Sequence, residues 1–248
     1  MTPRPILPWR SALLLAAAVA VAVPIAALAL DPGDDDALLV LAPSSLAPIE
    51  DDLNATMLDA GVGPIEWVFA GSQSLVAQVA DGVPADAVLV ADQVAFDAVL
   101  DAGGGLDREI TFASNHLVLA VAPDNPGDVA SVADLADPER LIGVCAAEVP
   151  CGRLAATALA ELGISVSADT EETSARALTA KIASGELDAG LIYVTDARAA
   201  GLDIVDEDEF ARFENTYHGA GTAAAGPFLD ALLGEEAAEV FTDAGFGG

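Results

Sequence analysis

The sequence predicts an α/β protein with two lobes, each containing a mostly parallel sheet flanked by helices. Short apolar segments alternate with helical patterns along most of the 248 residues, and this alternation is typical of parallel βαβ units. The turn Pro-Asp-Asn-Pro at 123–126 separates two series of such units. The chain is long enough for one large or two modest domains.

The first thirty residues are predicted to be a separate segment. Two arginines precede an apolar run at 11–30, which contains an Ala-Leu-Ala cleavage pattern. We therefore expect residues 1–29 to be a secretory signal peptide that is cleaved after Ala29, and residues 30–37 to be an acidic linker. A membrane anchor is the alternative because the run is close to spanning length, although Pro24 and the cleavage pattern favour an exported, processed protein.

The charge of the chain excludes several classes of partner. The chain has nine basic and 40 acidic residues, which gives a formal net charge of -31. Binding to nucleic acid or anionic lipid needs clusters of Lys and Arg, so neither is expected. The acidic residues are interleaved with apolar periodicity, which argues against disorder. A saline habitat is our hypothesis for the acidic surface.

Cys145 and Cys151 are the only cysteines. In an exported chain this pair is expected to form a disulfide. Closing so small a loop stabilises a fold by roughly 2 kcal/mol in the chain-entropy model. A metal site is the alternative, but two thiols without a nearby histidine fall short of the four ligands of zinc, so no metal cation is expected.

Two strand, turn and helix units near the start carry a serine at the turn. The apolar segment 38–42 leads to Ser45, and the segment 65–69 leads to Ser72. Each serine is predicted to cap the helix that follows it. The start of a helix presents unpaired N–H groups and the positive end of its dipole, so these turns suit an anion. The alternative for each is a structural cap without a ligand.

The same alternation continues along the rest of the chain. The predicted elements are strand 86–90, helix 94–102, strand 116–122, a short helix capped by Ser131, strand 140–144, a helix from Cys151 to Gly163, helix 171–184, strand 189–194 and helices 228–233 and 237–241. In such sheets ligands bind at the carboxyl ends of the strands, where the turns gather.

Five motifs together resemble the molybdate-binding proteins of ABC importers, which are type II periplasmic binding proteins. In the order and spacing of that family they are APSSL (42–46), FAGS (69–72), GVPADAVLVAD (82–92), EVPCGR (148–153) and DAGLIYVTDA (188–197). The resemblance extends from about residue 38 to 246. It implies capture of molybdate or tungstate in the cleft between the lobes, without a basic side chain, and delivery to a membrane permease and its ATPase.

The resemblance also implies which groups hold the ligand. They would be the hydroxyls of Ser45 and Ser72, the backbone N–H groups of Cys151 and Ala175, and the phenol of Tyr193. Each lies where a helix is predicted to start or a strand to end, so donors can converge on a dianion. The bound oxyanion is the expected ligand, and no cofactor is expected.

The family pattern divides the chain into lobe I, residues 38–114 plus 197–248, and lobe II, residues 115–196. One departure concerns residues 217–228, YHGAGTAAAGPF. This segment is shorter than the family pattern and lacks its apolar strand. The sequence therefore leaves open whether the sheet of the first lobe is completed. The protein is expected to be a monomer.

Other functions are less well supported by the residues. A serine nucleophile at Ser45 or Ser72 needs a base, yet only His116 and His218 are present and the nucleophile-elbow motif is missing. Cys151 is not a nucleophile if it is oxidised. We therefore expect no enzyme. A binding protein for another tetrahedral oxyanion such as sulfate, or an extracellular anion sensor, is the alternative.

Overall fold

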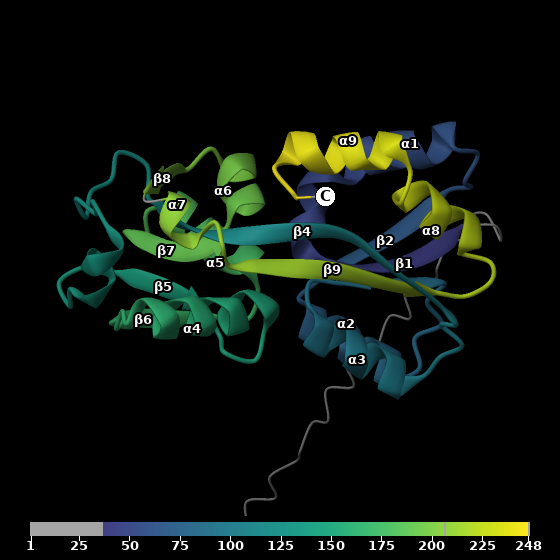
Figure 1. Ribbon diagram of the computed structural model, residues 1–248, viewed down its shortest axis with the longest axis horizontal. Coiled ribbons are helices and arrows are strands. Elements are labelled where there is room, and N and C mark those ends of the chain that lie inside the picture. The colour runs from purple at the N-terminus through teal and green to yellow at the C-terminus, as the bar shows by residue number, and fades with distance from the viewer. Residues whose placement is uncertain (1–36, 206, 248) are drawn as a thin grey trace, which may run out of the picture. The chain divides into compact units, whose positions relative to one another are not determined.

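Two antiparallel strands, β4 (Arg108–Val121) and β9 (Glu214–Gly221), connect the two lobes of the protein (Figure 1). The computed structural model describes residues 37–205 and 207–247. The predicted signal peptide, and all of the predicted linker except residue 37, lie outside the described residues. Strands β4 and β9 pair from Arg108 to His116, and β4 then continues into the second lobe, where it pairs with β7 (Ala189–Tyr193).

The first lobe has a five-stranded sheet in the order β2-β1-β3-β9-β4. Its other elements are β1 (Leu38–Pro43), η1 (Ser44–Ile49), α1 (Glu50–Asp59), β2 (Ile65–Ala70), α2 (Ser72–Ala80), β3 (Ala87–Val90), α3 (Gln93–Ala102), α8 (Gly226–Leu232) and α9 (Glu235–Ala244). Helices α2 and α3 cover one face of the sheet, and α1, α8 and α9 cover the other (Figure 1). All four residues of β3 are buried, as its continuous apolar sequence predicts.

The second lobe is built on β4, β7, β5 and β6, with β8 pairing on β4. Its elements are η2 (Val132–Ala136), β5 (Ile142–Cys145), α4 (Pro150–Leu162), β6 (Ala168–Glu172), α5 (Ala175–Ala183), α6 (Val194–Ala200), β8 (Asp203–Val205) and α7 (Glu207–Phe210). The predicted cap at Ser131 is confirmed, since Ser131 and Asp134 form a reciprocal capping box at the start of η2. Helix α4 ends at Gly163, which adopts the left-handed conformation favoured by glycine.

Both sheets are mixed rather than mostly parallel. In the first lobe β1 is parallel to β2 and β3, whereas β9 is antiparallel to both of its neighbours. In the second lobe β5 is parallel to β6 and β7, whereas β4 is antiparallel to β7 and β8. The antiparallel pairs arise where β4 and β9 carry the chain between the lobes.

Further sequence predictions about the strands and the chain path also differ from the structure. Residues 171–172 belong to β6 and not to a helix, because pairing with β5 extends the edge of the sheet. Leu202, Phe210 and Phe213 pack in the core of the second lobe, so the chain returns along β9, later than the crossing predicted at 197. Residues 217–221 do form a strand, and β9 completes the first sheet between β3 and β4.

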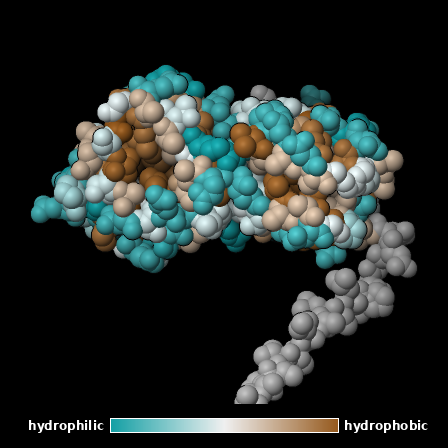
Figure 2. Space-filling model, turned by 90° about the horizontal axis from the view of Figure 1, so that it is seen from below, coloured by the Kyte–Doolittle hydropathy of each residue, from teal (hydrophilic) through white to brown (hydrophobic). Residues whose placement is uncertain are grey.

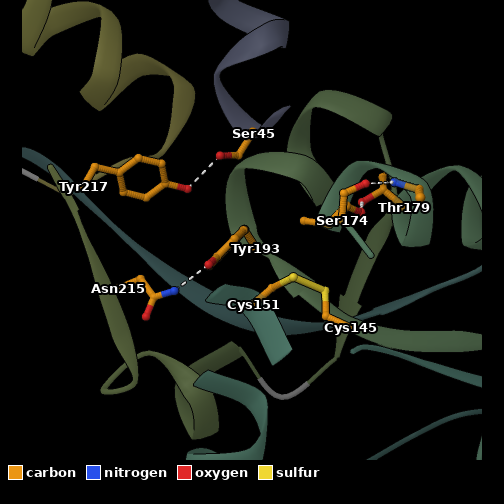
Figure 3. The surroundings of a disulfide bond; sticks show 10 residues. Ser45, Cys145, Cys151, Ser174, Thr179, Tyr193, Asn215 and Tyr217 are labelled. Atoms are coloured by element: carbon orange, nitrogen blue, oxygen red, sulfur yellow. Dashed lines mark hydrogen bonds between the residues drawn. A yellow bond between two sulfur atoms is a disulfide. The ribbon is translucent and has the colours of Figure 1, made fainter. Parts of the chain in front are cut away.

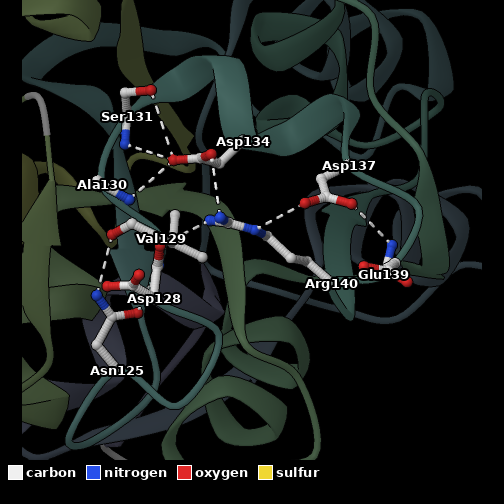
Figure 4. Close-up of polar contacts among 9 residues, drawn as sticks. All are labelled: Asn125, Asp128, Val129, Ala130, Ser131, Asp134, Asp137, Glu139 and Arg140. Carbon is white, nitrogen blue, oxygen red and sulfur yellow. Dashed lines mark hydrogen bonds and ion pairs between the residues drawn. The ribbon is translucent and has the colours of Figure 1, made fainter.

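Polar contacts order the loop that follows β4. The guanidinium of Arg140 forms ion pairs with Asp134 and Asp137, both at 3.2 Å, and its Nη1 donates to the carbonyl of Asp128 at 2.9 Å (Figure 4). The pKa of Asp134 is lowered mainly because its carboxylate accepts a hydrogen bond from the backbone N–H of Ala130. The nearby guanidinium of Arg140 lowers it to a smaller extent. These contacts hold the loop against the second lobe.

The surface combines hydrophilic residues with hydrophobic areas. The face in Figure 2 is largely hydrophilic and shows a hydrophobic area on each of its two parts. The large apolar side chains that are most exposed among the described residues are Leu58, Val94, Leu141 and Leu233. Within 37–205 and 207–247, no helix combines the length and the apolar character needed to cross a membrane.

Candidate functional site

A small cavity lies where the turns of the two lobes meet. It is lined from the first lobe by the starts of η1 and α2, and from the second lobe by the starts of α4 and α5 and the end of β7. All five residues proposed from the sequence line it: Ser45, Ser72, Cys151, Ala175 and Tyr193. The centre of a water-sized sphere can occupy about 20 Å³ of it. One water needs about 10–15 Å³ by this measure, so the space suits a ligand of small-ion size.

The first lobe presents two nearly buried hydroxyls. Ser45 and Ser72 are 4% and 2% exposed. The Oγ of Ser72 accepts a hydrogen bond from the backbone N–H of Ala91 at 3.2 Å, and the Oγ of Ser45 lies 2.8 Å from the Oη of Tyr217. Because Ser72 accepts from Ala91, its own hydrogen remains available for an acceptor in the cavity.

The prediction that these serines cap their helices was wrong. The cap positions are Pro43 for η1 and Gly71 for α2, and neither supplies a side-chain hydrogen bond. Both serines lie inside the first turn, so their hydroxyls bond to Tyr217 and Ala91 instead. The first N–H groups of each helix are therefore without a side-chain cap, which is the arrangement that an anion completes.

The second lobe presents backbone groups at two helix starts. Helix α4 begins at Pro150 after Val149, which provides no side-chain cap. The N–H of Cys151 lies in that first turn, where no intrahelical acceptor exists. Helix α5 begins at Ala175, and the hydroxyl of Ser174 caps it by accepting from the N–H of Ala177 at 3.2 Å. That cap leaves the N–H of Ala175 at the cavity.

Tyr193 closes the site at the end of β7. Its Oη accepts a hydrogen bond from Nδ2 of Asn215 at 2.5 Å (Figure 3). The hydroxyl hydrogen is therefore free to be donated to a second acceptor. Burial raises the pKa of Tyr193 well above its ordinary value, so the phenol stays protonated and remains a donor.

The predicted disulfide is confirmed, since Cys145 and Cys151 are bonded with their Cα atoms 5.8 Å apart (Figure 3). It closes the loop that leads into α4. Gly152 follows, and a Cβ at this position would lie 1.9 Å from the carbonyl oxygen of Ala146. Only glycine allows this close approach, so the disulfide and Gly152 together hold the first turn of α4 against the loop.

Two contacts join the lobes beside the cavity. The Nε of Arg153 on α4 donates to Oδ2 of Asp92 at 2.7 Å, and Asp92 also caps α3 by accepting from Ala95 at 2.8 Å. On the other side, a Cβ at Gly71 would lie 2.9 Å from the carbonyl oxygen of Thr173. The two lobes therefore lie in contact around the cavity.

The site has hydrogen-bond donors but no cationic side chain. Among the described residues that line the cavity, none is Lys, Arg or His. Hydroxyls and N–H groups from both lobes surround the space instead. Such a site favours a small anion whose charge is stabilised by preorganised neutral donors.

Four residues that orient these donors were not recognised from the sequence. They are Tyr217, Asn115, Asn215 and Ala91. Tyr217 lies in the segment interpreted as lacking a strand, and its contact with Ser45 spans 172 residues. Local patterns carry no signal for such a contact. Ala91 could have been recognised, because it directly follows the apolar strand β3.

Comparison with known proteins identifies the family. The model of the bacterial extracellular solute-binding proteins matches residues 38–247. The chain belongs to this family. The match includes both lobes and every residue that lines the cavity.

Among curated proteins, the chain is similar to the molybdate-binding protein ModA of Mycobacterium tuberculosis. They are 34% identical over 140 residues, which are 56% of this chain and 54% of the relative. The chain therefore matches about half the length of this relative.

Among solved structures, the sulfate-binding protein SubI of Mycobacterium tuberculosis has a TM-score of 0.72 at 19% identity, with 85% of this chain and 86% of that chain covered. The periplasmic molybdate-binding protein of Azotobacter vinelandii has a TM-score of 0.64 at 18% identity, with 84% and 98% covered. At these identities the likeness concerns the fold, and it confirms the two-lobed fold of type II periplasmic binding proteins.

Proposed function

We propose that the protein binds molybdate, and tungstate with it, in the cavity between the lobes. The observation that carries the proposal is the set of neutral donors around one small space: the hydroxyls of Ser45, Ser72 and Tyr193 and the N–H groups of Cys151 and Ala175. The similarity to a molybdate-binding relative supports the choice of ligand.

The donor set favours an anion without a proton. A buried dianion is costly unless donors surround it, and each hydrogen bond to a charged group contributes about 1.5–3 kcal/mol. Hydrogen phosphate brings a hydroxyl that needs an acceptor, and this proposed set has none to spare. Tungstate has nearly the size and charge of molybdate, so the same donors serve both.

Sulfate is the second candidate ligand. It is also an unprotonated dianion at neutral pH, and the structural neighbour with a TM-score of 0.72 is a sulfate-binding protein. Sulfate is smaller than molybdate, so donors spaced for molybdate reach it less well. Relative affinity for the two anions is the quantity that separates these candidates.

In the proposed role the protein is exported, captures the oxyanion as a monomer and delivers it to an ABC permease with its ATPase. Family membership supports the extracellular binding role. Among the described residues that line the cavity, none is a histidine that could act as a base for Ser45 or Ser72, and Cys151 is in a disulfide, so we propose binding without catalysis. An extracellular sensor that uses the same site would differ only in the partner that recognises the protein with its anion bound.

Calorimetric titration of the purified protein tests the proposal. Molybdate and tungstate should each bind with one-to-one stoichiometry, and sulfate and hydrogen phosphate should bind much more weakly. Tight sulfate binding with weak molybdate binding would favour the second candidate. Absence of heat with all four anions in a folded sample would reject the oxyanion site.

A further inference from the structure

A chain of buried hydrogen bonds leads away from Ser45 toward the junction of the lobes. The Oη of Tyr217 lies 2.8 Å from the Oγ of Ser45, and Nδ2 of Asn115 donates to Tyr217 at 3.3 Å. The same Nδ2 donates to the hydroxyl of Thr195, on α6 of the second lobe, at 2.8 Å. All four side chains are at least 96% buried, with exposed fractions of 4% or less.

One arrangement of the hydrogens gives each hydroxyl of this chain a hydrogen-bond partner. The amide of Asn115 has two hydrogens, and they go to Thr195 and Tyr217. Either hydroxyl could donate across the 2.8 Å contact between Tyr217 and Ser45. The phenol of Tyr217 is fully buried, and among the described residues Ser45 is the acceptor within its reach, so we assign the hydrogen of this contact to Tyr217. The oxygen of Ser45 is then an acceptor, and the Ser45 hydrogen is left for the cavity.

Packing fixes the phenol that makes this contact. Tyr217 is fully buried, with its ring against Phe112, Tyr193 and Phe246 at centroid distances of 6.0, 6.4 and 5.5 Å. Burial also raises the pKa of Tyr217 above its ordinary value, so the phenol keeps its hydrogen. The ring therefore presents a donor to Ser45 from a fixed direction.

We propose that Tyr217 and Asn115 are positioning residues that determine the selectivity of the site. They fix the hydroxyl of Ser45 as a donor to the bound anion, and so disfavour anions that carry a proton and need an acceptor there. This inference rests on the proposed oxyanion function of the cavity. Through Tyr217 on β9 and Asn115 on β4, these two strands contribute to recognition without touching the ligand.

The test is a double-mutant cycle of Tyr217→Phe and Ser45→Ala in the full protein, with affinity measured by calorimetry. Tyr217→Phe keeps the packed ring and removes only the hydroxyl. We expect it to weaken molybdate binding about tenfold, in line with the loss of one oriented hydrogen bond to an anion. In the Ser45→Ala protein the same change should have little further effect, because Tyr217 acts through Ser45.

Selectivity provides the second readout, which a purely structural role would not move. We expect Tyr217→Phe to lower the molybdate to hydrogen phosphate affinity ratio about tenfold, because the freed Ser45 hydroxyl can rotate and accept. Competition with molybdate at fixed pH measures this ratio. Asn115→Leu removes the group that orients Tyr217 while both hydroxyls remain, and it should change the ratio in the same direction by a smaller factor.

Thr111→Val is the matched control. It removes another hydroxyl contact between β4 and β9, the 3.1 Å bond from Thr111 to His218, which lies outside the cavity lining. Its molybdate affinity and its selectivity should equal those of the wild type. Additive effects in the cycle, or equal weakening of both anions by Tyr217→Phe, would overturn the inference. If the wild type binds no oxyanion, the proposed function itself fails.

Discussion

The two sides of the cavity present donors of different kinds. The first lobe contributes side-chain hydroxyls at Ser45 and Ser72, each held by a partner elsewhere in the lobe. The second lobe contributes the phenol of Tyr193 and, in addition, backbone N–H groups at Cys151 and Ala175, which the helix starts themselves orient. A hydroxyl rotates and needs a neighbour to fix its hydrogen, whereas a backbone N–H does not. The proposed donors of the first lobe therefore depend on side-chain identity alone, whereas two of the three from the second lobe depend on main-chain geometry.

The second lobe also holds a buried carboxyl group, that of Asp196, and its titration should have the largest effect on stability. Asp196 is 4% exposed, and burial raises its pKa from 3.8 to about 7 although Arg176 lowers it. The folded protein keeps a proton on Asp196 between about pH 4 and pH 7, where the unfolded chain has lost it. Stability relative to Asp196→Asn should therefore fall as pH rises through this range, by up to about 4 kcal/mol, and stay constant above it.

Urea unfolding of wild type and Asp196→Asn at several pH values measures this difference. The comparison of the two proteins at each pH removes the contributions of the other carboxylates. If the free energies of unfolding of the two proteins differ by a constant amount between pH 4 and pH 8, the pKa of Asp196 is not raised by burial.

Removing a side-chain hydroxyl from the first lobe should cause the largest loss of molybdate affinity. Ser72→Ala removes one hydroxyl donor to the dianion and leaves the N–H of Ala91 without its acceptor. A hydrogen bond to a charged group contributes about 1.5–3 kcal/mol, so molybdate affinity should fall roughly 10- to 100-fold. Calorimetry measures this loss, and Ser174→Ala, which removes a cap hydroxyl on the other side, provides the comparison. Equal losses in both variants would remove the distinction between the two sides.

Removal of the disulfide should affect stability more than binding. In the double variant Cys145→Ala with Cys151→Ala, the backbone N–H of residue 151 remains at the start of α4. We expect the free energy of unfolding to fall by about 2 kcal/mol and molybdate affinity to change less than threefold. Thermal unfolding and calorimetry on the same samples measure both. A large loss of affinity in a folded double variant would show that main-chain geometry at α4 depends on the disulfide.

Weakening the contact between the lobes should have the smallest effect. Asp92→Asn keeps the cap of α3 and removes the charge that faces Arg153, a pair with side chains 10% and 24% exposed. We expect a loss of binding free energy of no more than about 1 kcal/mol. Asp230→Asn is the matched control, since it breaks the more exposed pair with Arg108 within the first lobe. Affinity that is equally reduced in both variants would exclude a specific contribution from the interlobe pair.

Local pattern and the resemblance to the family contributed differently to the prediction of the site. Local pattern placed Ser45 and Ser72 at turns between a strand and a helix, and the resemblance to the family supplied Cys151, Ala175 and Tyr193. All five residues line the same cavity. The contribution of Tyr217 was not predictable in this way. Its strand contains Gly219, where a Cβ would lie 2.6 Å from Cδ2 of Leu89, so the small residues that suggested a loop are required by close packing.

The errors at Ser45, Ser72 and residues 171–172 have a similar origin. Local sequence favoured caps and a helix, but tertiary partners decided the outcome. Tyr217 and Ala91 bond to the two hydroxyls, and β5 pairs with the edge strand β6. Hydrogen bonds between residues far apart in the sequence are invisible to periodicity and propensity.

Crystallography with bound tungstate, using diffraction near a tungsten absorption edge, tests the central claim most directly. The anomalous signal locates the metal atom of the oxyanion without reference to its neighbours. We predict one strong peak in the cavity, with oxyanion oxygens within hydrogen-bond distance of the Ser45 and Ser72 hydroxyls and the N–H groups of Cys151 and Ala175. A peak elsewhere in a protein that binds tungstate in solution would contradict the proposed site.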